Sequence, residues 1–230
     1  MLDNFKERLH PAFDDRRNTW VFDLDNTLYP AECNLFAQVD TRIGEYVQQL
    51  LKLPPDEARK VQKAYLLDHG TTLKGLMANH DVDPRHYLDH VHDIDFSPIP
   101  QDSNLRGLLQ QLQGRKIIFT NADLTYAEKV LARLGIADQF EDIFDIHAAN
   151  LEPKPKRAVY DNFVQKYRID PKRSVMFEDM VRNLKPAHAL GMATVWINTG
   201  SVWGEADYDT AFVHAETKVL TDWLQAFLNR

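Results

Sequence analysis

Residues 20–30 read WVFDLDNTLYP, and the rest of the chain is organised around this stretch. Its first half is an apolar run suited to a buried strand, and its second half is rich in turn-forming residues. Asp23 and Asp25 stand where the two halves meet. In an extended chain the side chains of residues i and i+2 share a face, so both carboxylates point into the same space. Two anions this close repel each other, and a cation or a bound proton must compensate.

The size and composition of the chain indicate a globular protein with one good-sized domain or two modest ones. It has 230 residues, of which 44% are hydrophobic and 27% charged, and its net charge is −7. This acidic balance argues against a nucleic-acid polymer as partner, because there is no basic surplus to displace counterions. A small phosphate ester needs only a few cations in a local pocket, so it fits the composition.

Three features predict a cytoplasmic protein that does not engage a membrane. Cys33 is the only cysteine, so no internal disulfide can form. Residues 1–8 lack the apolar core of a signal peptide. No apolar run approaches the roughly 20 residues that a membrane-spanning helix needs. We therefore expect a reducing compartment.

After Pro30 the pattern changes to helical periodicity and stays helical to about residue 95. Apolar residues recur at steps of three and four in the first part of this segment. Pro55 suits the start of a second helix, and Asp83 is a candidate cap for a fourth. We predict an all-helical cap domain over residues 31–95, between the two parts of a core formed by 18–30 and 96–230. Residues 1–17 are interpreted as a loosely attached lead-in.

From residue 96 onward, helix and strand patterns alternate. Expected helices cover 102–112, 124–134, 156–168, 184–190 and 216–228, and expected strands cover 19–24, 116–120, 143–146, 174–177 and 193–197. Such alternation implies parallel βαβ units around a central sheet. The predicted fold class is therefore α/β, with a Rossmann-like parallel sheet flanked by helices and a helical cap inserted after the first strand. Sheets of this kind bind ligands at the carboxyl ends of their strands.

Four places in the chain satisfy that rule. They carry Asp23 with Asp25, Thr120 with Asn121, Lys154, and Glu178 with Asp179. In this order they resemble the four motifs of the haloacid dehalogenase superfamily, mainly its phosphatase branch. The helical segment stands where that family inserts its first type of cap. One such motif alone is common in proteins, but four in order, each at a strand end, are specific.

The resemblance implies a role for each residue. A phosphate monoester resists attack because its oxygens are anionic, and its transition state is loose and in-line. By resemblance Asp23 is the nucleophile and forms an aspartyl-phosphate. Asp25 would protonate the leaving oxygen and then deprotonate the attacking water. Thr120 and Lys154 would stabilise the transferring phosphoryl group.

The resemblance also implies Mg²⁺ as cofactor. Asp23, the backbone carbonyl of Asp25, and Asp179 would hold the ion, with Glu178 as a neighbouring ligand. The chain departs from many relatives in two places. Glu178 stands where they have Gly, and Asn183 stands where they often carry another acid, so that direct metal contact by Glu178 or Asn183 stays open.

Two further stretches narrow the resemblance. Residues 25–30, DNTLYP, and residues 69–76, HGTTLKGL, are similar to the pyrimidine 5′-nucleotidase group, whose members remove phosphate from nucleoside monophosphates such as UMP and CMP. We therefore expect a nucleoside monophosphate as substrate. The residues expected to contact it are Asn26, Tyr29, Thr71, Thr72, Lys74 and Asn121.

Three alternatives stay open at this point, as do the oligomeric state and the pathway. The first is a phosphatase of another small metabolite, such as phosphoglycolate or a sugar phosphate. The second is a 2-haloacid dehalogenase, which uses the same nucleophile but needs neither the metal nor the second Asp; Asp25 and Asp179 count against it. The third is a non-catalytic protein that binds a phosphorylated ligand, and the presence of every catalytic group counts against it.

One cluster lies outside these motifs. His86 and His90 are four residues apart on one helical face, and His92 and Asp93 follow closely. This spacing allows metal binding. No third well-placed ligand accompanies the two histidines, so we interpret the cluster as structural.

Overall fold

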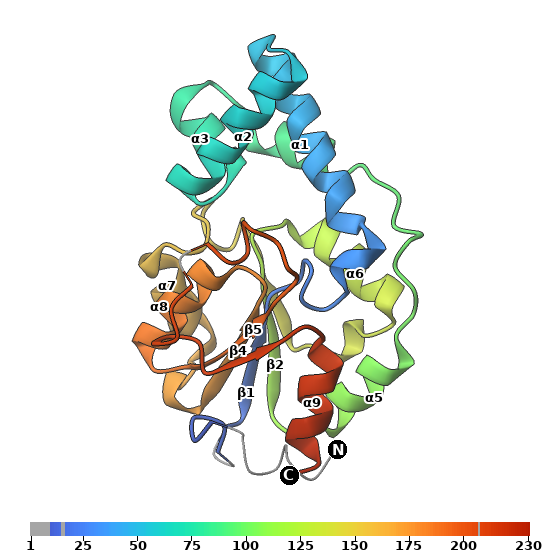
Figure 1. The fold of residues 1–230 in the computed structure, drawn as a ribbon, viewed down its shortest axis with the longest axis vertical. Coiled ribbons are helices and arrows are strands. Elements are labelled where there is room, and N and C mark those ends of the chain that lie inside the picture. The colour runs from blue at the N-terminus through green and yellow to red at the C-terminus, as the bar shows by residue number, and fades with distance from the viewer. Residues whose placement is uncertain (1–9, 15–16, 207) are drawn as a thin grey trace.

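The computed structural model of the chain describes residues 10–14, 17–206 and 208–230. Figure 1 shows an α/β core below and a helical cap above it. Within the described part of the chain, the core holds one six-stranded sheet with the order β3-β2-β1-β4-β5-β6. Every pair of neighbouring strands in it is parallel. The strands are β1 (Thr19–Phe22), β2 (Arg115–Phe119), β3 (Asp142–Phe144), β4 (Ser174–Glu178), β5 (Ala193–Ile197) and β6 (Ala215–Thr217). The predicted α/β fold class is confirmed.

Helices cover both faces of the sheet. Trp20 and Phe22 of β1 face the hydrophobic core under α5, α6 and α9, whereas Val21 faces the core under α7 and α8. All four residues of β1 are buried, as expected for a central strand of a parallel sheet. The covering helices are α5 (Ser103–Gln111), α6 (Leu124–Leu134), α7 (Arg157–Tyr167), α8 (Val181–Leu190) and α9 (Leu220–Leu228). Three short 3-10 helices are η1 (Ala31–Cys33), η2 (Ala137–Gln139) and η3 (Pro171–Arg173).

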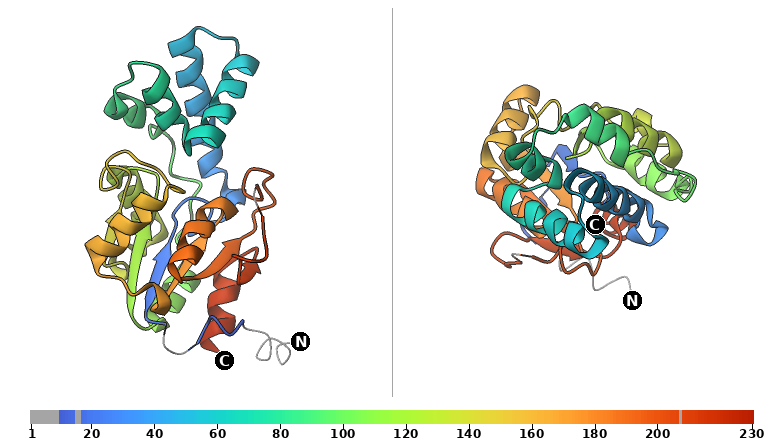
Figure 2. Two further views of the ribbon diagram at one scale, coloured as in Figure 1. Left: turned by 90° about the vertical axis from the view of Figure 1, so that its left-hand side faces the viewer. Right: turned by 90° about the horizontal axis from the view of Figure 1, so that it is seen from above.

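The cap stands over the carboxyl ends of the strands, as Figure 2 shows from two further directions. Its helices are α1 (Leu35–Leu51), α2 (Pro55–His69), α3 (Thr72–Asn79) and α4 (Pro84–Val91). The side chain of Asp83 caps α4 by accepting the N–H of Arg85 at 2.9 Å. No helix in the described residues is both long enough and apolar enough to cross a bilayer.

A glycine determines how closely two cap helices approach. A Cβ atom added to Gly75 of α3 would lie 2.4 Å from both the Cβ and the Cγ of Tyr65 on α2. Real side-chain atoms do not come so close without displacement. The contact between α2 and α3 therefore depends on the missing side chain at residue 75.

The prediction of one helix over 216–228 is wrong at its beginning. Ala215–Thr217 form β6, which pairs in parallel with β5, and α9 begins only at Leu220. β6 is an edge strand with a single neighbour, so its side chains need not be apolar, and Glu216 is exposed. A three-residue strand is too short to give a periodicity that a sequence pattern can detect.

The interpretation of residues 1–17 as a loose lead-in is only partly open to comparison, because residues 1–9, 15 and 16 lie outside the described chain. Within the described part, Phe13 is 2% exposed and packs edge-on against Trp223 at 5.1 Å between ring centroids. The guanidinium of Arg17 donates to the carbonyls of Lys172 and Ser174 at 2.6 and 3.0 Å. Loose attachment is wrong for this part, because a buried aromatic ring anchors it.

Candidate active site

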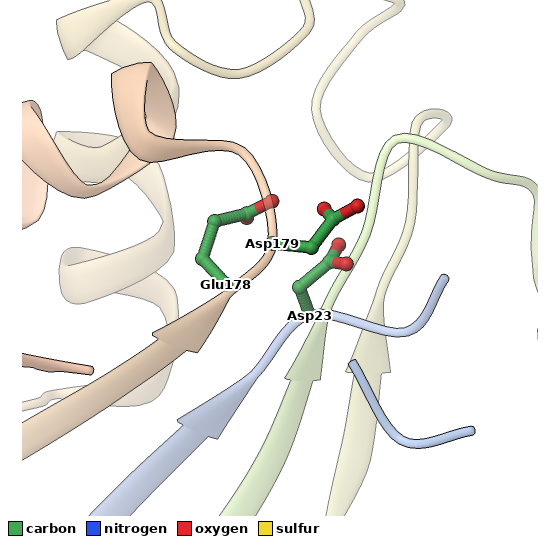
Figure 3. Close-up of side chains that lie close together, drawn as sticks. All are labelled: Asp23, Glu178 and Asp179. Atoms are coloured by element: carbon green, nitrogen blue, oxygen red, sulfur yellow. The ribbon is translucent and has the colours of Figure 1, made fainter. Parts of the chain in front are cut away.

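Three carboxylates converge at the carboxyl ends of β1 and β4. Asp23 follows β1, Glu178 is the last residue of β4, and Asp179 follows it. One oxygen from each lies within 4.8 Å of the others, and all three residues are buried. Figure 3 shows the three side chains pointing toward one another from these neighbouring strand ends. The Asp23 N–H donates to the Phe177 carbonyl at 2.9 Å, so the first carboxylate is held in register with β4.

The ammonium group of Lys154 lies among these acids. Its Nζ is 2.7 Å from Oδ1 of Asp23, 2.7 Å from Oε2 of Glu178 and 2.8 Å from the carbonyl oxygen of Phe119. These three bonds use every donor that an ammonium has. Lys154 is 1% exposed, so its charge is fixed in place rather than shared with solvent.

Asn121 holds the backbone of Lys154. Its Oδ1 accepts the Lys154 N–H at 2.8 Å, and its Nδ2 donates to the Lys154 carbonyl at 3.4 Å. The sequence pattern led us to expect Asn121 as a substrate contact. In the structure both polar atoms of the Asn121 amide instead bond to the backbone of Lys154, although Asn121 still lines the cavity.

The site holds more negative than positive charge. Burial, followed by the charge of Glu178, raises the pKa of Asp23 to about 7, although Lys154 acts in the opposite direction. Burial, followed by Glu178 and Asp23, raises the pKa of Asp179 well above its ordinary value. Burial opposes the charge of Lys154, but the two carboxylates outweigh it and raise the lysine pKa. One ammonium does not balance three carboxylates, and a divalent cation would restore the balance.

The donor set fits a magnesium ion, which prefers oxygen ligands and one or two carboxylates. Both oxygens of Glu178 already accept hydrogen bonds, Oε2 from Lys154 and Oε1 from the Asn183 amide at 3.1 Å. Oδ2 of Asp179 accepts from Asn26 at 3.3 Å, which leaves Oδ1 for a cation. The buried Oδ1 of Asn183 has no hydrogen-bond partner among the described residues, so an ion or its water would satisfy it.

Asp25 occupies a different environment from Asp23. Its Oδ1 accepts hydrogen bonds from the hydroxyls of Tyr29 at 2.5 Å and Tyr126 at 2.7 Å. Burial, followed by the charge of Asp23, raises the pKa of Asp25 to about 6, and the two hydroxyls act against this rise. Two carboxylates in unlike environments are typical of a site that separates a nucleophile from a proton carrier.

The carboxylates open into a cavity of about 400 Å³ between core and cap. This volume is in the range that small-molecule sites occupy. The core contributes Asp23, Asp25, Thr120, Asn121, Lys154 and Asp179, and the cap contributes Phe36, Asp40, Arg59, Gln62, Lys63, Thr71, Thr72 and Tyr87. Trp203, from the segment between β5 and β6, also lines it.

Two expected substrate contacts do not line this cavity. Tyr29 is 1% exposed and directs its hydroxyl to Asp25. Lys74 forms an ion pair with Glu152, which links the cap to the core. Neither Tyr29 nor Lys74 is therefore assigned to substrate contact.

The other three expected contacts line the cavity but have local tasks as well. Asn26 donates to Asp179, and its positive φ of 55° is a backbone conformation that asparagine tolerates. The Thr71 hydroxyl caps α3 by accepting the Lys74 N–H at 3.2 Å. The Thr72 hydroxyl donates to the Gln62 carbonyl at 3.1 Å.

Sequence reasoning missed the polar cluster on the cap side of the cavity. Asp40 of α1 accepts hydrogen bonds from Arg59, Gln62 and Lys63 of α2, at 2.9, 2.7 and 2.7 Å. Gln62 and Lys63 lie three and four positions after Arg59, so each of them shares a helical face with Arg59. That spacing in the sequence could have indicated a polar face on α2. The sequence pattern does not show that Asp40 of α1 is the residue that this face contacts.

Two histidines of the cluster in and after α4 contact polar side chains. His86 lies 3.1 Å from the Tyr46 hydroxyl, and His92 lies 2.6 Å from Oδ2 of Asp123. Among the described residues, the group found with metal-ligand geometry consists of Asp23, Glu178 and Asp179 and includes no histidine.

A family model for the haloacid dehalogenase-like hydrolases matches residues 18–191. This range covers most of the chain, and the chain therefore belongs to the haloacid dehalogenase-like hydrolase family. It is also similar to Phosphate metabolism protein 8 of Saccharomyces cerevisiae, with 30% identity over 149 residues. The aligned part makes up 60% of this chain but only 46% of the yeast protein, so the chain spans about half the length of that relative.

Several solved structures share the fold. CbbY from Rhodobacter sphaeroides, in complex with phosphate, has a TM-score of 0.64 at 15% identity, over 93% of this chain and 100% of that one. The putative HAD-hydrolase YfnB from Bacillus subtilis, bound to magnesium, has a TM-score of 0.61 at 15% identity, over 93% and 99%. The L-2-haloacid dehalogenase of Xanthobacter autotrophicus has a TM-score of 0.54 at 14% identity, over 91% and 97%. Such likeness concerns the fold alone, so the chemistry must be argued from the site.

Proposed function

We propose that the chain is a magnesium-dependent phosphomonoesterase that acts through an aspartyl-phosphate on Asp23. The observation that carries the proposal is the contrast between two acids. Asp23 is paired with Lys154 beside Glu178 and Asp179, whereas Asp25 is held apart by two tyrosine hydroxyls. The family match supports a hydrolase, and the phosphate and magnesium bound by two structures of similar fold support this chemistry.

Magnesium would be held by Asp23, Asp179 and the backbone carbonyl of Asp25, and when bound it would neutralise phosphoryl oxygens. Lys154 fixes Oδ1 of Asp23 and thereby orients the carboxylate that attacks phosphorus. The Thr120 hydroxyl accepts the Ala122 N–H at 3.0 Å, so its own hydrogen is free to reach a phosphoryl oxygen. Asp25 gives a proton to the leaving oxygen and afterwards takes one from the water that hydrolyses the aspartyl-phosphate.

We further propose that the substrate is a pyrimidine nucleoside 5′-monophosphate. The cavity continues beyond the carboxylates to the cap, where Asp40, Gln62 and Lys63 offer hydrogen-bonding groups and Trp203 offers an aromatic face. A phosphate at Asp23 would leave the nucleoside beside this polar and aromatic wall. The similarity of residues 25–30 and 69–76 to the pyrimidine 5′-nucleotidase group supports the same choice.

The test is phosphate release from a panel of monophosphates with Mg²⁺, repeated in EDTA. UMP and CMP should be hydrolysed faster than AMP, phosphoglycolate or glucose 6-phosphate, and EDTA should abolish turnover. Faster hydrolysis of phosphoglycolate or a sugar phosphate would overturn the nucleotidase assignment but not the phosphomonoesterase. Halide release from 2-chloropropionate in EDTA, without any phosphate release, would overturn both.

The nucleophile is tested separately with Asp23→Asn. This variant should release no phosphate above background from p-nitrophenyl phosphate, because an amide cannot attack phosphorus. Activity that survives the substitution would mean that another group is the nucleophile.

A further inference from the structure

We propose that Tyr126 and Tyr29 are positioning residues that fix which oxygen of Asp25 carries the proton to the leaving group. The inference rests on the proposed function, in which Asp25 is the proton donor. It adds a specific role for two buried tyrosines. One of them, Tyr126, lies on a helix that is 101 residues from Asp25 along the chain but close to it in space.

The two hydroxyls converge on a single atom. Tyr29 and Tyr126 both donate to Oδ1 of Asp25, at 2.5 and 2.7 Å, and the hydroxyl oxygens are 3.4 Å apart. An oxygen that accepts two hydrogen bonds has no lone pair to spare for a proton of its own. The acid proton of Asp25 is therefore placed on Oδ2, and the carboxyl group cannot rotate without breaking both bonds. Asp25 lines the cavity, and Oδ2 is the carboxyl oxygen that neither tyrosine hydroxyl contacts.

Tyr126 is itself held from both domains, at its backbone by the core and at its ring by the cap. On the core side, Asp123 accepts the Tyr126 N–H at 2.8 Å and caps α6. On the cap side, the ring of His92 stacks on that of Tyr126, with centroids 4.3 Å apart and an angle of 23°. His92 also lies 2.6 Å from the other oxygen of Asp123. Tyr126 and His92 are thus held by the same carboxylate, and the cap contributes to the orientation of the acid.

The contribution of an oriented acid to the rate of phosphate transfer increases with the basicity of the leaving group. A poor leaving group such as phenolate needs protonation as its bond to phosphorus breaks, whereas 2,4-dinitrophenolate departs without it. Loss of a positioning tyrosine should therefore harm reactions with poor leaving groups selectively. A tyrosine that only filled space would affect all leaving groups alike.

The experiment compares kcat/KM for phenyl, p-nitrophenyl and 2,4-dinitrophenyl phosphate in the wild type, Tyr126→Phe and Tyr29→Phe. This ratio covers the steps up to departure of the leaving group and excludes the later hydrolysis. We expect each variant to lose about tenfold or more on phenyl phosphate and less than about threefold on 2,4-dinitrophenyl phosphate. Equal losses on all three substrates, or no loss, would overturn the inference. Tyr29→Phe keeps the test decisive if Tyr126→Phe fails to fold.

Tyr167→Phe is the matched control, because the Tyr167 hydroxyl also donates to an aspartate, Asp142, at 2.8 Å but away from the cavity. It should leave all three values unchanged. Asp25→Asn separates the two proposals. If Asp25→Asn shows the leaving-group dependence and the tyrosine variants do not, the positioning role is wrong. If Asp25→Asn loses equally on all three substrates, the acid role in the proposed function is wrong.

Discussion

At the scale of single residues, Lys154 should be the most sensitive position in the core. Lys154→Met leaves Asp23 and Glu178 buried without their cation, and breaking a buried pair in this way costs about 3–5 kcal/mol. We also expect phosphatase activity to fall by about a hundredfold or more, because the fixed charge beside Asp23, the proposed nucleophile, is lost. Urea unfolding and phosphate release measure the two effects.

Lys156→Met is the control for that substitution. Lys156 is two residues away, its side chain is 50% exposed, and it pairs with Glu152 at the surface. Exposed pairs contribute little, so stability should change by less than about 1 kcal/mol. Equal destabilisation by the two substitutions would contradict the account of Lys154 as a buried, fully bonded cation.

His214 gives the molecule a pH dependence unrelated to catalysis. Burial, followed by the charges of His10 and His188, lowers its pKa from 6.5 to about 4. Its Nδ1 accepts the Thr194 N–H at 3.1 Å, a bond that protonation of this nitrogen would break. The unfolded chain thus binds more protons here than the folded one, so this contribution is complete above about pH 6.5 and is lost as the pH falls toward 4.

The expected difference is modest because the ring is partly exposed and solvent screens the interaction. Between pH 7 and pH 5, the wild type should lose on the order of 1 kcal/mol more than His214→Asn, which keeps an acceptor but does not titrate. Thermal unfolding at the two pH values measures it. A variant with the same pH dependence as the wild type would rule out His214 as the titrating group.

Residues that stand at strand ends could be predicted from the sequence, and those that reach the site from helices could not. Asp23 and Asp179 each directly follow a strand, and the carboxyl ends of parallel strands meet at one edge, so their meeting could be predicted. The strand-end expectation is wrong for Lys154, which lies in a turn ten residues after the end of β3, and its place in the site rests on the resemblance. Tyr126 lies within α6, where aromatic residues usually indicate core packing. Its hydroxyl contact with Asp25 depends on the angle between α6 and the sheet, which no local pattern contains.

At the scale of elements, two glycines in helices should respond in opposite ways to the same change. Gly75→Ala would place a Cβ 2.4 Å from the Tyr65 side chain, so α2 and α3 must separate, at a cost of about 1–3 kcal/mol. Gly107, within α5, has nothing within 4 Å of an added Cβ. Gly107→Ala should therefore stabilise the protein by about 0.5–1 kcal/mol, because alanine favours the helix.

Denaturant unfolding of the two variants checks this pair. Stabilisation by both would show that intrinsic helix preference, rather than the approach of α2 to α3, decides the result at residue 75. Destabilisation by both would contradict the account of Gly107. Because Gly75 is in the cap, activity on nucleotides should fall with Gly75→Ala and stay constant with Gly107→Ala.

Long helices were predicted well because each carries many apolar residues at regular steps. α6 begins and ends at the predicted residues, and Gly135 closes it in the left-handed conformation. The strand β6 was missed because three residues at a sheet edge, Ala215, Glu216 and Thr217, are too few to show a period. The error lies where tertiary pairing with β5, rather than local preference, selects the structure.

At the scale of the whole molecule, the cavity between cap and core limits what can react. Its volume of about 400 Å³ and its lining by both cap and core residues suit a small ester but not a phosphorylated side chain of a folded protein. We expect phosphate release from UMP under conditions where phosphorylated casein releases none above the blank. Comparable rates per phosphate on casein and UMP would mean that the cap does not restrict access.

The central place of β1 in the sheet has a consequence for the order of events during synthesis. β1 leaves the ribosome before both of its neighbours, which begin only at Arg115 and Ser174, after the whole cap has been made. The cap helices contact one another locally, whereas the sheet depends on distant pairings. We therefore expect the cap to fold before β4 has been synthesised, when the central sheet of the core cannot yet form. The strand that leads to Asp23 would then be fixed later than the cap, so that the three carboxylates come together only after β4 has been made.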